Sequence, residues 1–459
     1  MKEYSPDAYY RRVNEVNAIN AHAYDRSISA LRRDKWLFEP ILKNNPNIPK
    51  LTEEQIREVE EFWRPYEFAY KNDYRQQEMF TGISGKFDPS YFGFGLQRHL
   101  MVSFWNHESF KWIGEKNFAP LYFPEAKMPE TYVYNSCGVY FDPDRNPITQ
   151  QQAVDLLLQK LADSDHREAI IKPSGGGEGK DISFIRPDAS RAEVEQIIKH
   201  YGNDFICQRV IKNHPCLSAL YSGSLNTMRM ITLFWKNEVH YVGSVLRMGT
   251  NKRVDNWSQG GLACGIEPDG RLQEYAFTEF GHLVNVHPTT GFVFKDHVIY
   301  RFPEAIELVK KLHGHIAQQK FVSWDITVDE DGDLVLVELN SPGSHEMLQL
   351  SGQNGYGSRE ITKEIFDEYL VRRFFLNKAN FDWDYREFRD HISLREYKGL
   401  DTKISVPKEI DGKPVRMLYE NAIMQKNIEQ IAIPRTVSFS KNSFPNVQAN
   451  CDIKILVDD

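Results

Sequence analysis

The stretch VSWDITVDEDGDLVLVELNSPG most constrains the fold, because it predicts a hairpin that carries two acids on one face. Asp331-Gly332 is typical of a two-residue turn, and the apolar residues on either side alternate as they do in strands. Folding the chain symmetrically about this turn places Asp325 opposite Glu338, and Asn340 follows on the same face. We therefore expect two carboxylates and an amide to cluster there.

The acid pair on this hairpin needs a positive charge nearby. Like charges directly across a strand pair destabilise a sheet by up to ~1 kcal/mol, and the apolar neighbours predict that much of the hairpin is buried. Carboxylate and amide oxygens suit Mg²⁺, which usually keeps water and substrate phosphates as its other ligands. We expect Asp325, Glu338 and Asn340 to hold Mg²⁺. The alternative is a solvated strand face on which the acids have no joint role.

Composition and charge exclude several classes of protein. The chain has 459 residues, 41% hydrophobic and 26% charged side chains, and a net charge of -8, as expected for a soluble globular protein of about three domains. A net acidic chain lacks the broad basic surface that phosphate backbones attract, so nucleic acid is not an expected partner. The N-terminus has no apolar signal segment and no run approaches the ~20 residues of a membrane span, so neither secretion by this route nor membrane insertion is expected.

The cysteines indicate a reducing compartment. They are odd in number, scattered, and show no CxxC spacing, which indicates neither a disulfide framework nor a zinc site. We therefore expect a cytoplasmic protein. The cysteines are Cys137, Cys207, Cys216, Cys264 and Cys451.

The order of the predicted elements indicates an α+β fold. Residues 1–111 form a helical and α/β region, in which Thr52 and Gln55 form a capping box that opens a helix. The later elements follow as antiparallel units, unlike the regular βαβ alternation of a doubly wound sheet. Helices are predicted at 150–162, after Ser190 and at 304–319, and strands at 169–172, 181–185, 205–210, 226–235 and 240–248.

A glycine-rich loop follows a lysine at the end of a predicted strand. In IIKPSGGGEGK the lysine is Lys172, and Gly175, Gly176 and Gly177 lie in the turn. Glycines let backbone N–H groups approach phosphate oxygens closely, and the lysine adds a positive charge. The pattern is not the Walker motif, because a second strand rather than a helix follows the loop. We expect a phosphate cradle here, and the alternative is a glycine-rich hairpin that binds nothing.

The last part of the chain contains an internal repeat. KISVPKEIDGKPVRMLYENAI and IEQIAIPRTVSFSKNSF both read as a strand ending in proline followed by a turn, which indicates a solenoid and resembles leucine-rich repeats of the bacterial surface-antigen (BspA) type. We expect a linker at 381–396 and the repeat tail at 397–459. Two copies bury little surface alone, so the tail is expected to dock on the main body or on a partner protein.

Together, the strand, the glycine loop, a later hinge strand and the acidic hairpin resemble the ATP-grasp fold, in which two α+β subdomains clamp ATP. The resemblance covers about residues 112–375 and implies a catalytic domain at 112–380 that uses ATP and Mg²⁺. It also implies that Lys116, in GEKNFAPLYF, and Lys172 are the two phosphate-binding lysines. The residue before the first lysine is Glu115 here, where the superfamily more often has Asp.

The segment FICQRVIKNHP looks like the hinge between the two subdomains. In the ATP-grasp superfamily the hinge meets the adenine, which implies that backbone groups of Gln208 and Val210 contact the edge of the base. The same resemblance implies that Asn213 or His214 reaches the ribose.

Two further segments resemble the substrate loops of amide-forming ligases. DNWSQGG, with Arg253 just before it, is similar to the Arg-x-x-Asn and Gly-Gly segment of the ribosomal-protein glutamate ligases, which implies that Arg253 and Asn256 contact substrate. ELNSPGS looks like the metal and substrate loop of the D-alanine-D-alanine ligases, which implies the same role for Ser341 and Gly343.

One position departs from the D-alanine ligases. Those enzymes carry an arginine two residues before the metal-binding aspartate, whereas this chain has Ser323. The basic group that faces the transferred phosphoryl must therefore come from another strand. Arg229 and Arg247, on neighbouring predicted strands, are the candidates for this catalytic role.

The whole chain resembles the sugar-transfer-associated ATP-grasp proteins, in stretches such as KNFAPLYFPEAKMPETYVYNSCGVYFD, SLNTMRMIT and HPTTGF. The resemblance implies a setting among surface-polysaccharide genes more than it implies a defined reaction. We expect an ATP-dependent ligase that joins a carboxylate, on a small molecule, glycan or peptide, to an amine through an acyl phosphate. The alternatives are a phosphotransferase with the same ATP site and a nucleotide-binding scaffold that recruits glycan-assembly partners.

Overall fold

Contacts between residues divide the chain into two units in the computed structural model. The larger unit comprises residues 33–59 and 73–362, and the other unit contains residues 363–459. All residues of the predicted site that the structure describes lie in the larger unit. The described residues are 34–35, 37–66, 73–97, 113–163, 168–175, 181–341, 343, 345–368, 382–397, 401–410, 412–426, 428–447 and 451–456.

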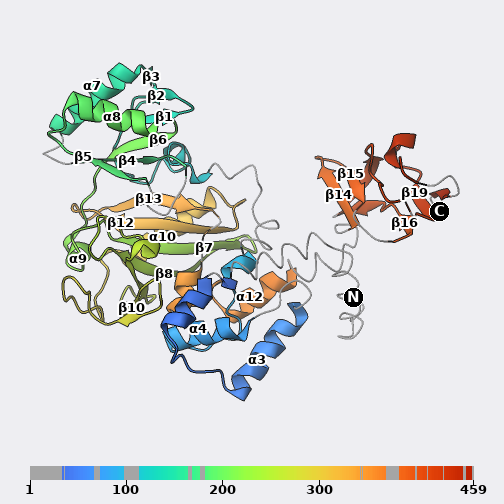
Figure 1. The fold of residues 1–459 in the computed structure, drawn as a ribbon, viewed down its shortest axis with the longest axis horizontal. Coiled ribbons are helices and arrows are strands. Elements are labelled where there is room, and N and C mark those ends of the chain that lie inside the picture. The colour runs from blue at the N-terminus through green and yellow to red at the C-terminus, as the bar shows by residue number, and fades with distance from the viewer. Residues whose placement is uncertain are drawn as a thin grey trace. The chain divides into compact units, whose positions relative to one another are not determined.

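Six antiparallel strands and two helices form the small subdomain of the larger unit (Figure 1). The strand order is β3-β2-β1-β6-β4-β5. Helices α7 and α8 cover one face of this sheet, and apolar residues at helical spacing, Ala153, Val154, Leu157 and Leu161, form the buried side of α7. The elements are β1 (Thr131–Ser136), β2 (Val139–Phe141), β3 (Pro147–Ile148), α7 (Gln150–Asp163), β4 (Ala169–Pro173), β5 (Ser183–Ile185), α8 (Arg191–Tyr201) and β6 (Phe205–Arg209).

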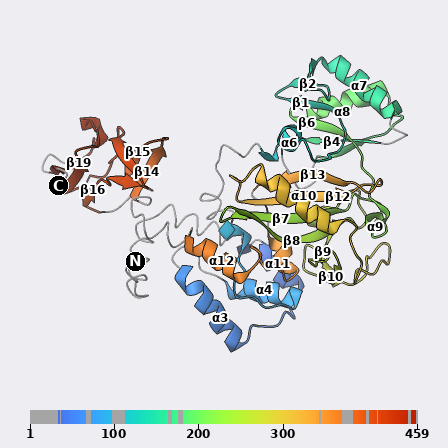
Figure 2. The same ribbon diagram turned by 180° about the vertical axis from the view of Figure 1, so that it is seen from behind.

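Seven antiparallel strands form the sheet of the large subdomain, in the order β11-β10-β9-β8-β7-β12-β13. Helix α10 covers one face of it (Figure 2). Phe302, Ala305, Val309 and Leu312 recur at helical spacing and pack into one core with Trp324 of β12. The elements are β7 (Thr227–Trp235), β8 (Glu238–Met248), β9 (Leu262–Ile266), β10 (Leu272–Phe277), β11 (Leu283–Val284), α10 (Phe302–Gly314), β12 (Phe321–Val328) and β13 (Leu334–Asn340).

The hairpin of β12 and β13 pairs its acids as predicted but turns differently. Asp325 is the cross-strand partner of Glu338. Asp329 and Asp333 close a three-residue loop in which Gly332 has a φ of 86°, so the predicted two-residue turn is wrong. A β-bulge beside Asp325, where β13 carries one extra residue, cancels the resulting shift. Because a slip of one residue would send the side chains to the other face, the bulge keeps the two acids together.

Shorter helices accompany the two sheets. The predicted capping box is present before α3, where Thr52 and Gln55 exchange hydrogen bonds, and Ser190 and Glu193 form a second one before α8. Helix α11 packs against α4 and β8. The remaining helices are α3 (Glu53–Trp63), η1 (Arg64–Tyr66), α4 (Tyr74–Ser84), α6 (Ala119–Tyr122), α9 (Pro215–Ser218), η4 (Trp257–Gln259), α11 (Glu346–Leu350) and α12 (Arg359–Phe366).

The C-terminal strands form a module with its own core. Strands β16, β19 and β20 stack in parallel, and Gln430 pairs with both Lys403 and Asp452, offsets of 27 and 22 residues along the chain. The solenoid and its leucine-rich-repeat assignment stay predictions. The strands are β16 (Lys403–Ser405), β17 (Glu409–Ile410), β18 (Lys413–Leu418), β19 (Gln430–Pro434) and β20 (Asp452–Leu456), with η6 (Lys441–Ser443) before the last.

The expected linker at 381–396 is corrected by the structure. This segment contains β14 (Trp383–Glu387) and most of β15 (Ile392–Tyr397), and β15 pairs in parallel with β18. Trp383 is buried in the core of the C-terminal module. The module therefore includes these two strands. Their apolar and polar residues alternate over too few positions for the sequence to distinguish them from a linker.

Two buried histidines of the larger unit are neutral. His345 stacks on Phe92 at 4.1 Å and forms hydrogen bonds through both ring nitrogens, to the Phe92 carbonyl and the Gln97 side chain. His313 does the same with Thr232 and with the carbonyl of Gln319. Burial lowers the pKa of His345 to about 3 and that of His313 to about 4.

Acid should therefore destabilise the larger unit from about pH 6.5 downward. In the unfolded chain these histidines bind a proton near their ordinary pKa, and in the folded chain they bind it only at much lower pH. Their contribution is complete above pH ~6.5 and falls by about 1.4 kcal/mol per pH unit for each histidine as the pH drops towards 4. Urea unfolding at pH 7.5, 5.5 and 4.5 measures this loss.

The variant His345→Gln serves as the control for the acid effect. It removes the group with the lower pKa, so its unfolding free energy should depend less steeply on pH than that of the unmodified chain between pH 6.5 and 4.5. Identical slopes for the two proteins would contradict the assignment of the acid effect to His345.

Candidate active site

Asp325 lies at the centre of the candidate site, because β12 runs between β7 and β13. Its cross-strand partner on β7 is Arg229, and its partner on β13 is Glu338. The exposed fraction of the side chain is 1% for Asp325 and 23% for Glu338. The strand order thus places a buried acid between a cation and a second, more accessible acid.

Two arginines neutralise the buried acid. Arg229 donates from Nε to Asp325 Oδ1 at 2.5 Å and from Nη2 to Oδ2 at 3.1 Å, and Arg247 donates from Nη2 to Oδ2 at 2.9 Å. Burial by itself raises the pKa of Asp325, but the two guanidinium groups outweigh burial and hold the pKa below its ordinary value. In both arginines, Nη1 donates no hydrogen bond to another described residue, so it can serve an anionic ligand.

Two lysines from other segments reach the same acids. Lys116 Nζ lies 3.5 Å from Glu338 Oε2, and the backbone N–H of Lys116 donates to the Ser174 carbonyl at the end of β4. Lys172, on β4, is 9% exposed. Burial lowers the pKa of Lys172 to about 8 against the attraction of Glu338, and the neighbouring Lys116 lowers it too. An anion bound beside these lysines would offset that cost.

The oxygen donors of the site fit a magnesium ion that also binds phosphate. Asp325 accepts three hydrogen bonds from the arginines, which leaves about one of the four lone-pair positions of a carboxylate. Glu338 is more accessible, and Asn340 Nδ2 lies 3.5 Å from its Oε1. Within the described ranges, no three His, Cys, Asp or Glu side chains form a metal cluster, so the amide and phosphate oxygens would complete the shell.

The predicted hinge residues are mostly engaged by the protein itself. Gln208 pairs with Ile170 on one side and Thr131 on the other, inside the small sheet. The Val210 N–H donates to the Glu168 carbonyl at 3.0 Å, so an adenine could accept from it only if this bond broke. The base contacts of Gln208 and Val210 stay predictions.

The residues predicted to reach the ribose have structural contacts, and their ribose contact stays a prediction. His214 caps α9, where its Nδ1 accepts from the Cys216 N–H at 3.2 Å, and its ring stacks on Tyr300 at 4.6 Å. Asn213 is buried and exchanges hydrogen bonds with Asn226. These contacts account for both side chains without a nucleotide, because polar residues at helix starts and buried strand ends need such partners.

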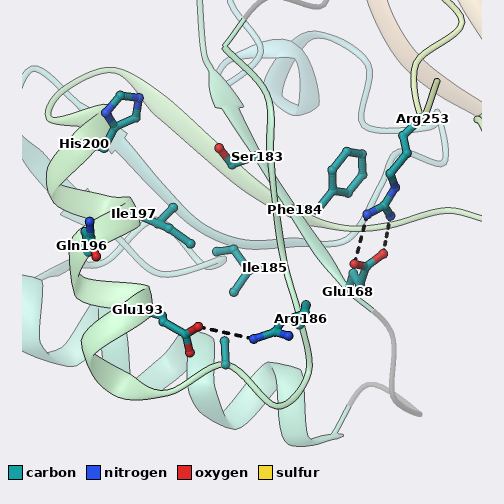
Figure 3. A pocket seen from close by; sticks show the side chains of 11 residues that line it. Glu168, Ser183, Phe184, Ile185, Arg186, Glu193, Gln196, Ile197, His200 and Arg253 are labelled. Atoms are coloured by element: carbon teal, nitrogen blue, oxygen red, sulfur yellow. Dashed lines mark hydrogen bonds and ion pairs between the residues drawn. The ribbon is translucent and has the colours of Figure 1, made fainter.

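Arg253 joins the two subdomains at a different place. It forms a two-pronged ion pair with Glu168, with Nη1 3.1 Å from Oε1, and its guanidinium lies 3.6 Å from the centre of the Phe184 ring. Figure 3 shows these side chains at a cavity of about 620 Å³ that none of the four cations and two acids described above lines. A substrate contact of Arg253 stays a prediction, because protein groups already occupy its guanidinium.

The other predicted loop residues have varied surroundings. Asn256 accepts from the Ser258 N–H at 3.1 Å and thereby caps η4. Gly175 lies next to Glu115, whose Oε2 would be 3.1 Å from a Cβ at that glycine. Gly176 and Gly177 lie outside the described residues, so the phosphate cradle is described only at its first glycine.

Ser341 and Gly343 follow the acidic hairpin. The Ser341 hydroxyl donates to Gln319 Oε1 at 2.5 Å. A Cβ on Gly343 would lie 2.0 Å from Ser323 Oγ and 2.7 Å from the Ser323 backbone nitrogen. Glycine is required at this position by the close approach of two backbone segments, which the substrate resemblance alone does not explain.

The sequence pattern of the family described as sugar-transfer associated ATP-grasp matches residues 125–365, more than half of the chain. The chain belongs to this family. The match takes in both subdomains and ends before the C-terminal module. Membership agrees with the observed architecture of two α+β subdomains, in which the small sheet carries Lys172 and the large sheet carries the two acids.

Comparisons with solved structures list ATP-grasp ligases at low similarity. D-cycloserine synthetase DcsG aligns at 15% identity and a TM-score of 0.35 over 56% of this chain and 71% of its own. D-alanyl-alanine synthetase A from Vibrio cholerae aligns at 10% identity and a TM-score of 0.34, over 56% of this chain and 65% of its own. L-amino acid ligase from Bacillus licheniformis aligns at 11% identity and a TM-score of 0.30, over 57% of this chain and 48% of its own. At these scores the assignment rests on the family match. A search of curated proteins found no match.

Two residues of the candidate site are not among those predicted from the sequence. Thr227 and Asp255 contact Arg247, which explains how its guanidinium is held. A single threonine in a strand and a single acid in a loop give no periodic signal. Among the described residues, no helix is long and apolar enough to cross a membrane.

Replacing Gly343 by alanine should destabilise this ATP-grasp protein by about 1–3 kcal/mol, the usual cost of forcing a methyl group into a packed site. The reason is the overlap with Ser323, where backbone as well as side chain would have to move. Urea unfolding measures the loss.

Gly314→Ala is the matched control, because a Cβ at the end of α10 meets nothing within 4 Å. That variant should be neutral or more stable by up to ~1 kcal/mol. Equal unfolding free energies for the two alanine variants would contradict the steric role of Gly343.

Proposed function

We propose that the protein is an ATP-dependent carboxylate–amine ligase that acts through an acyl phosphate. The observation that carries the proposal is the convergence of four cations from both subdomains on the acid pair of one hairpin. Such a cluster suits a reaction that transfers a negatively charged group. Membership in the ATP-grasp family makes ATP the nucleotide that we expect to bind there. The cations are Lys116, Lys172, Arg229 and Arg247.

Each part of the cluster has a role in this proposal. Lys116 and Lys172 would bind phosphate oxygens, and the Nη1 groups of Arg229 and Arg247 would face the transferred phosphoryl. Glu338, Asn340 and the remaining lone pair of Asp325 would hold Mg²⁺. When bound, the ion would neutralise phosphate charge and align the phosphoryl with its acceptor.

The proposed chemistry proceeds in two displacements. A carboxylate oxygen of the substrate bonds to the terminal phosphorus of ATP as the bond to ADP breaks. An amine nitrogen then bonds to the carbonyl carbon, inorganic phosphate leaves, and the amine loses a proton. The arginines would work chiefly by position and charge, since phosphoryl transfer needs little covalent help from the protein.

The substrates are proposed only by class. The family description associates the fold with sugar transfer, which favours a carboxylate or amine on a glycan, a glycan precursor or a peptide conjugate. Surface-polysaccharide biosynthesis in the cytoplasm is the proposed setting. The C-terminal module, which the family match does not cover, would contact an acceptor or a protein partner.

MgATP should stabilise the protein, because a bound polyphosphate offsets the mutual repulsion of the four cations. At 100 times its Kd the nucleotide should add about 2.7 kcal/mol to the unfolding free energy, enough to raise the Tm by several degrees. Thermal unfolding with and without MgATP measures the shift. Mg²⁺ with sulfate is the control, and an unchanged Tm with saturating MgATP would contradict the nucleotide site.

Hydroxylamine separates the ligase from its alternatives. A ligase should release ADP only when a carboxylate is present, and hydroxylamine should convert the acyl phosphate to a hydroxamate that mass spectrometry detects. A stable phosphorylated product formed without any amine would instead establish a phosphotransferase. ATP binding without ADP release across a broad set of carboxylates would favour a nucleotide-binding scaffold.

A further inference from the structure

Arg247 is anchored by more than the central acid. Its Nε and Nη2 donate to Thr227 Oγ1 at 3.2 and 2.8 Å, and its Nη2 also lies 3.5 Å from Asp255 Oδ2 and 2.9 Å from Asp325 Oδ2. Arg229 lacks this second set, because all its hydrogen bonds to described residues go to Asp325. The two arginines of the site are therefore held differently.

The hydrogen-bond pattern at Thr227 has only one consistent direction. Its oxygen accepts from two nitrogens of Arg247, so its single hydroxyl proton is left to donate to another atom. That atom is Oδ2 of Asp255, with which Thr227 forms a short hydrogen bond. Thr227 thus relays the charge of Asp255 to the guanidinium, and Asp255 also attracts Arg247 directly.

Asp255 is placed to do this by the large sheet. Thr227 and Arg247 are cross-strand partners on β7 and β8, and Asp255 comes from the loop that follows β8. The exposed fraction of the side chain is 16% for Asp255 and 12% for Arg247, so water competes little for their interaction.

The second anchor matters because Asp325 has two tasks in the proposed function. A metal ion at the remaining lone pair of Asp325 would compete with the arginines for the negative charge of this carboxylate, so their hold on Asp325 would weaken when the metal binds. Arg247 keeps Thr227 and Asp255 in that state, whereas Arg229 has no other described acceptor.

We infer that Asp255, through Thr227, is the positioning residue that fixes Arg247 toward the transferred phosphoryl. The inference rests on the proposed function, because it concerns the arginine of the same phosphoryl site. Asp255 itself need not touch the nucleotide. Removing the Asp255 carboxylate should therefore weaken the binding of a ligand that imitates the transition state of phosphoryl transfer. The binding of the nucleotide product, ADP, should stay nearly unchanged.

The test compares two ligands of the full-length protein by isothermal titration calorimetry. MgADP alone probes the nucleotide site, and MgADP with aluminium fluoride imitates the phosphoryl in transfer. The unmodified protein should bind the second at least ~100-fold more tightly than the first. Asp255→Asn, which keeps the shape but removes the charge, should reduce that preference by about 10-fold or more and change the MgADP affinity by less than about 2-fold.

Two variants of Thr227 test the same inference independently. Thr227→Val removes the relaying hydroxyl and should lower the preference as Asp255→Asn does, whereas Thr227→Ser keeps the hydroxyl and should restore it to within about 2-fold. This pair keeps the test decisive if Asp255→Asn does not fold. Asp329→Asn is the matched control, because Asp329 is a buried acid of the same subdomain that lies in the hairpin loop and pairs with Lys127. This variant should leave the preference unchanged.

The outcomes separate the inference from the proposed function. An unchanged preference in Asp255→Asn and in Thr227→Val would overturn the positioning role while leaving the ligase proposal in place. Failure of the unmodified protein to prefer MgADP with aluminium fluoride would overturn both. A loss in Thr227→Ser as large as in Thr227→Val would also overturn the inference, because the relay depends only on the hydroxyl.

Discussion

Replacing Glu338 by glutamine is expected to lower the rate of ADP formation from MgATP by roughly 100- to 1000-fold, the scale of losing one electrostatic contact in an active site. The amide keeps the shape of the side chain but removes a proposed metal ligand and the counter-charge of Lys116. Hydroxylamine and a mixture of carboxylates supply the acceptors in the assay. Because 23% of the Glu338 side chain is exposed, the unfolding free energy should change little.

Asp333→Asn is the matched control for this prediction. Asp333 directly precedes β13 in the same hairpin, its side chain is 52% exposed, and it pairs with Lys127 at the surface. An exposed pair of this kind contributes little to stability, so this variant should keep its activity and nearly all its stability. Near-normal ADP formation by Glu338→Gln, with Asp333→Asn also active, would contradict the metal assignment.

Replacing Asp325 by alanine should destabilise the larger unit by about 3–5 kcal/mol, the usual cost of leaving a buried charge without its partner. The change leaves Arg229 and Arg247 beside each other, 10% and 12% exposed, without the acid that separates their charges. Urea unfolding at pH 7.5 measures the loss. Activity should disappear as well, but the stability readout does not depend on a known substrate.

A double variant distinguishes unpaired charge from lost packing. Asp325→Leu combined with Arg229→Met removes a buried ion pair and replaces it with apolar groups, which often costs little or nothing. The double variant should therefore be more stable than Asp325→Leu alone. If the two single losses simply add, the ion pair has no coupling and the large effect of Asp325→Ala would need another cause.

The sequence predicts the hairpin site well because its signals are local. Residues of β12 and β13 alternate between faces with a period of two, so the order of the residues alone pairs Asp325 with Glu338 across one turn. The pairing holds despite the wrong turn only because a bulge compensates for it. Lys116 and Lys172 are indicated by family resemblance and not by periodicity, since an isolated lysine carries no pattern.

Other parts of the site depend on strand order, which the sequence does not display. Arg229 faces Asp325 because β7 lies beside β12, although 96 residues separate the two side chains along the chain. Arg253, likewise, pairs with Glu168 of the small subdomain, 85 residues away along the chain, while its substrate contact stays a prediction. Neither pairing has a local signature, because packing and loop closure select it from many alternatives of similar local preference.

The sequence by itself therefore determined the acid pair, the two lysines and the ATP-grasp family, which reside in short segments with period-two alternation or a recognisable pattern. Only the tertiary structure decided which arginines neutralise Asp325 and how Thr227 and Asp255 hold one of them. The physical reason is that a buried charge takes its partner from whichever strand lies within about 4 Å, where attraction is strongest at low dielectric. That neighbour is fixed by the packing of the whole sheet.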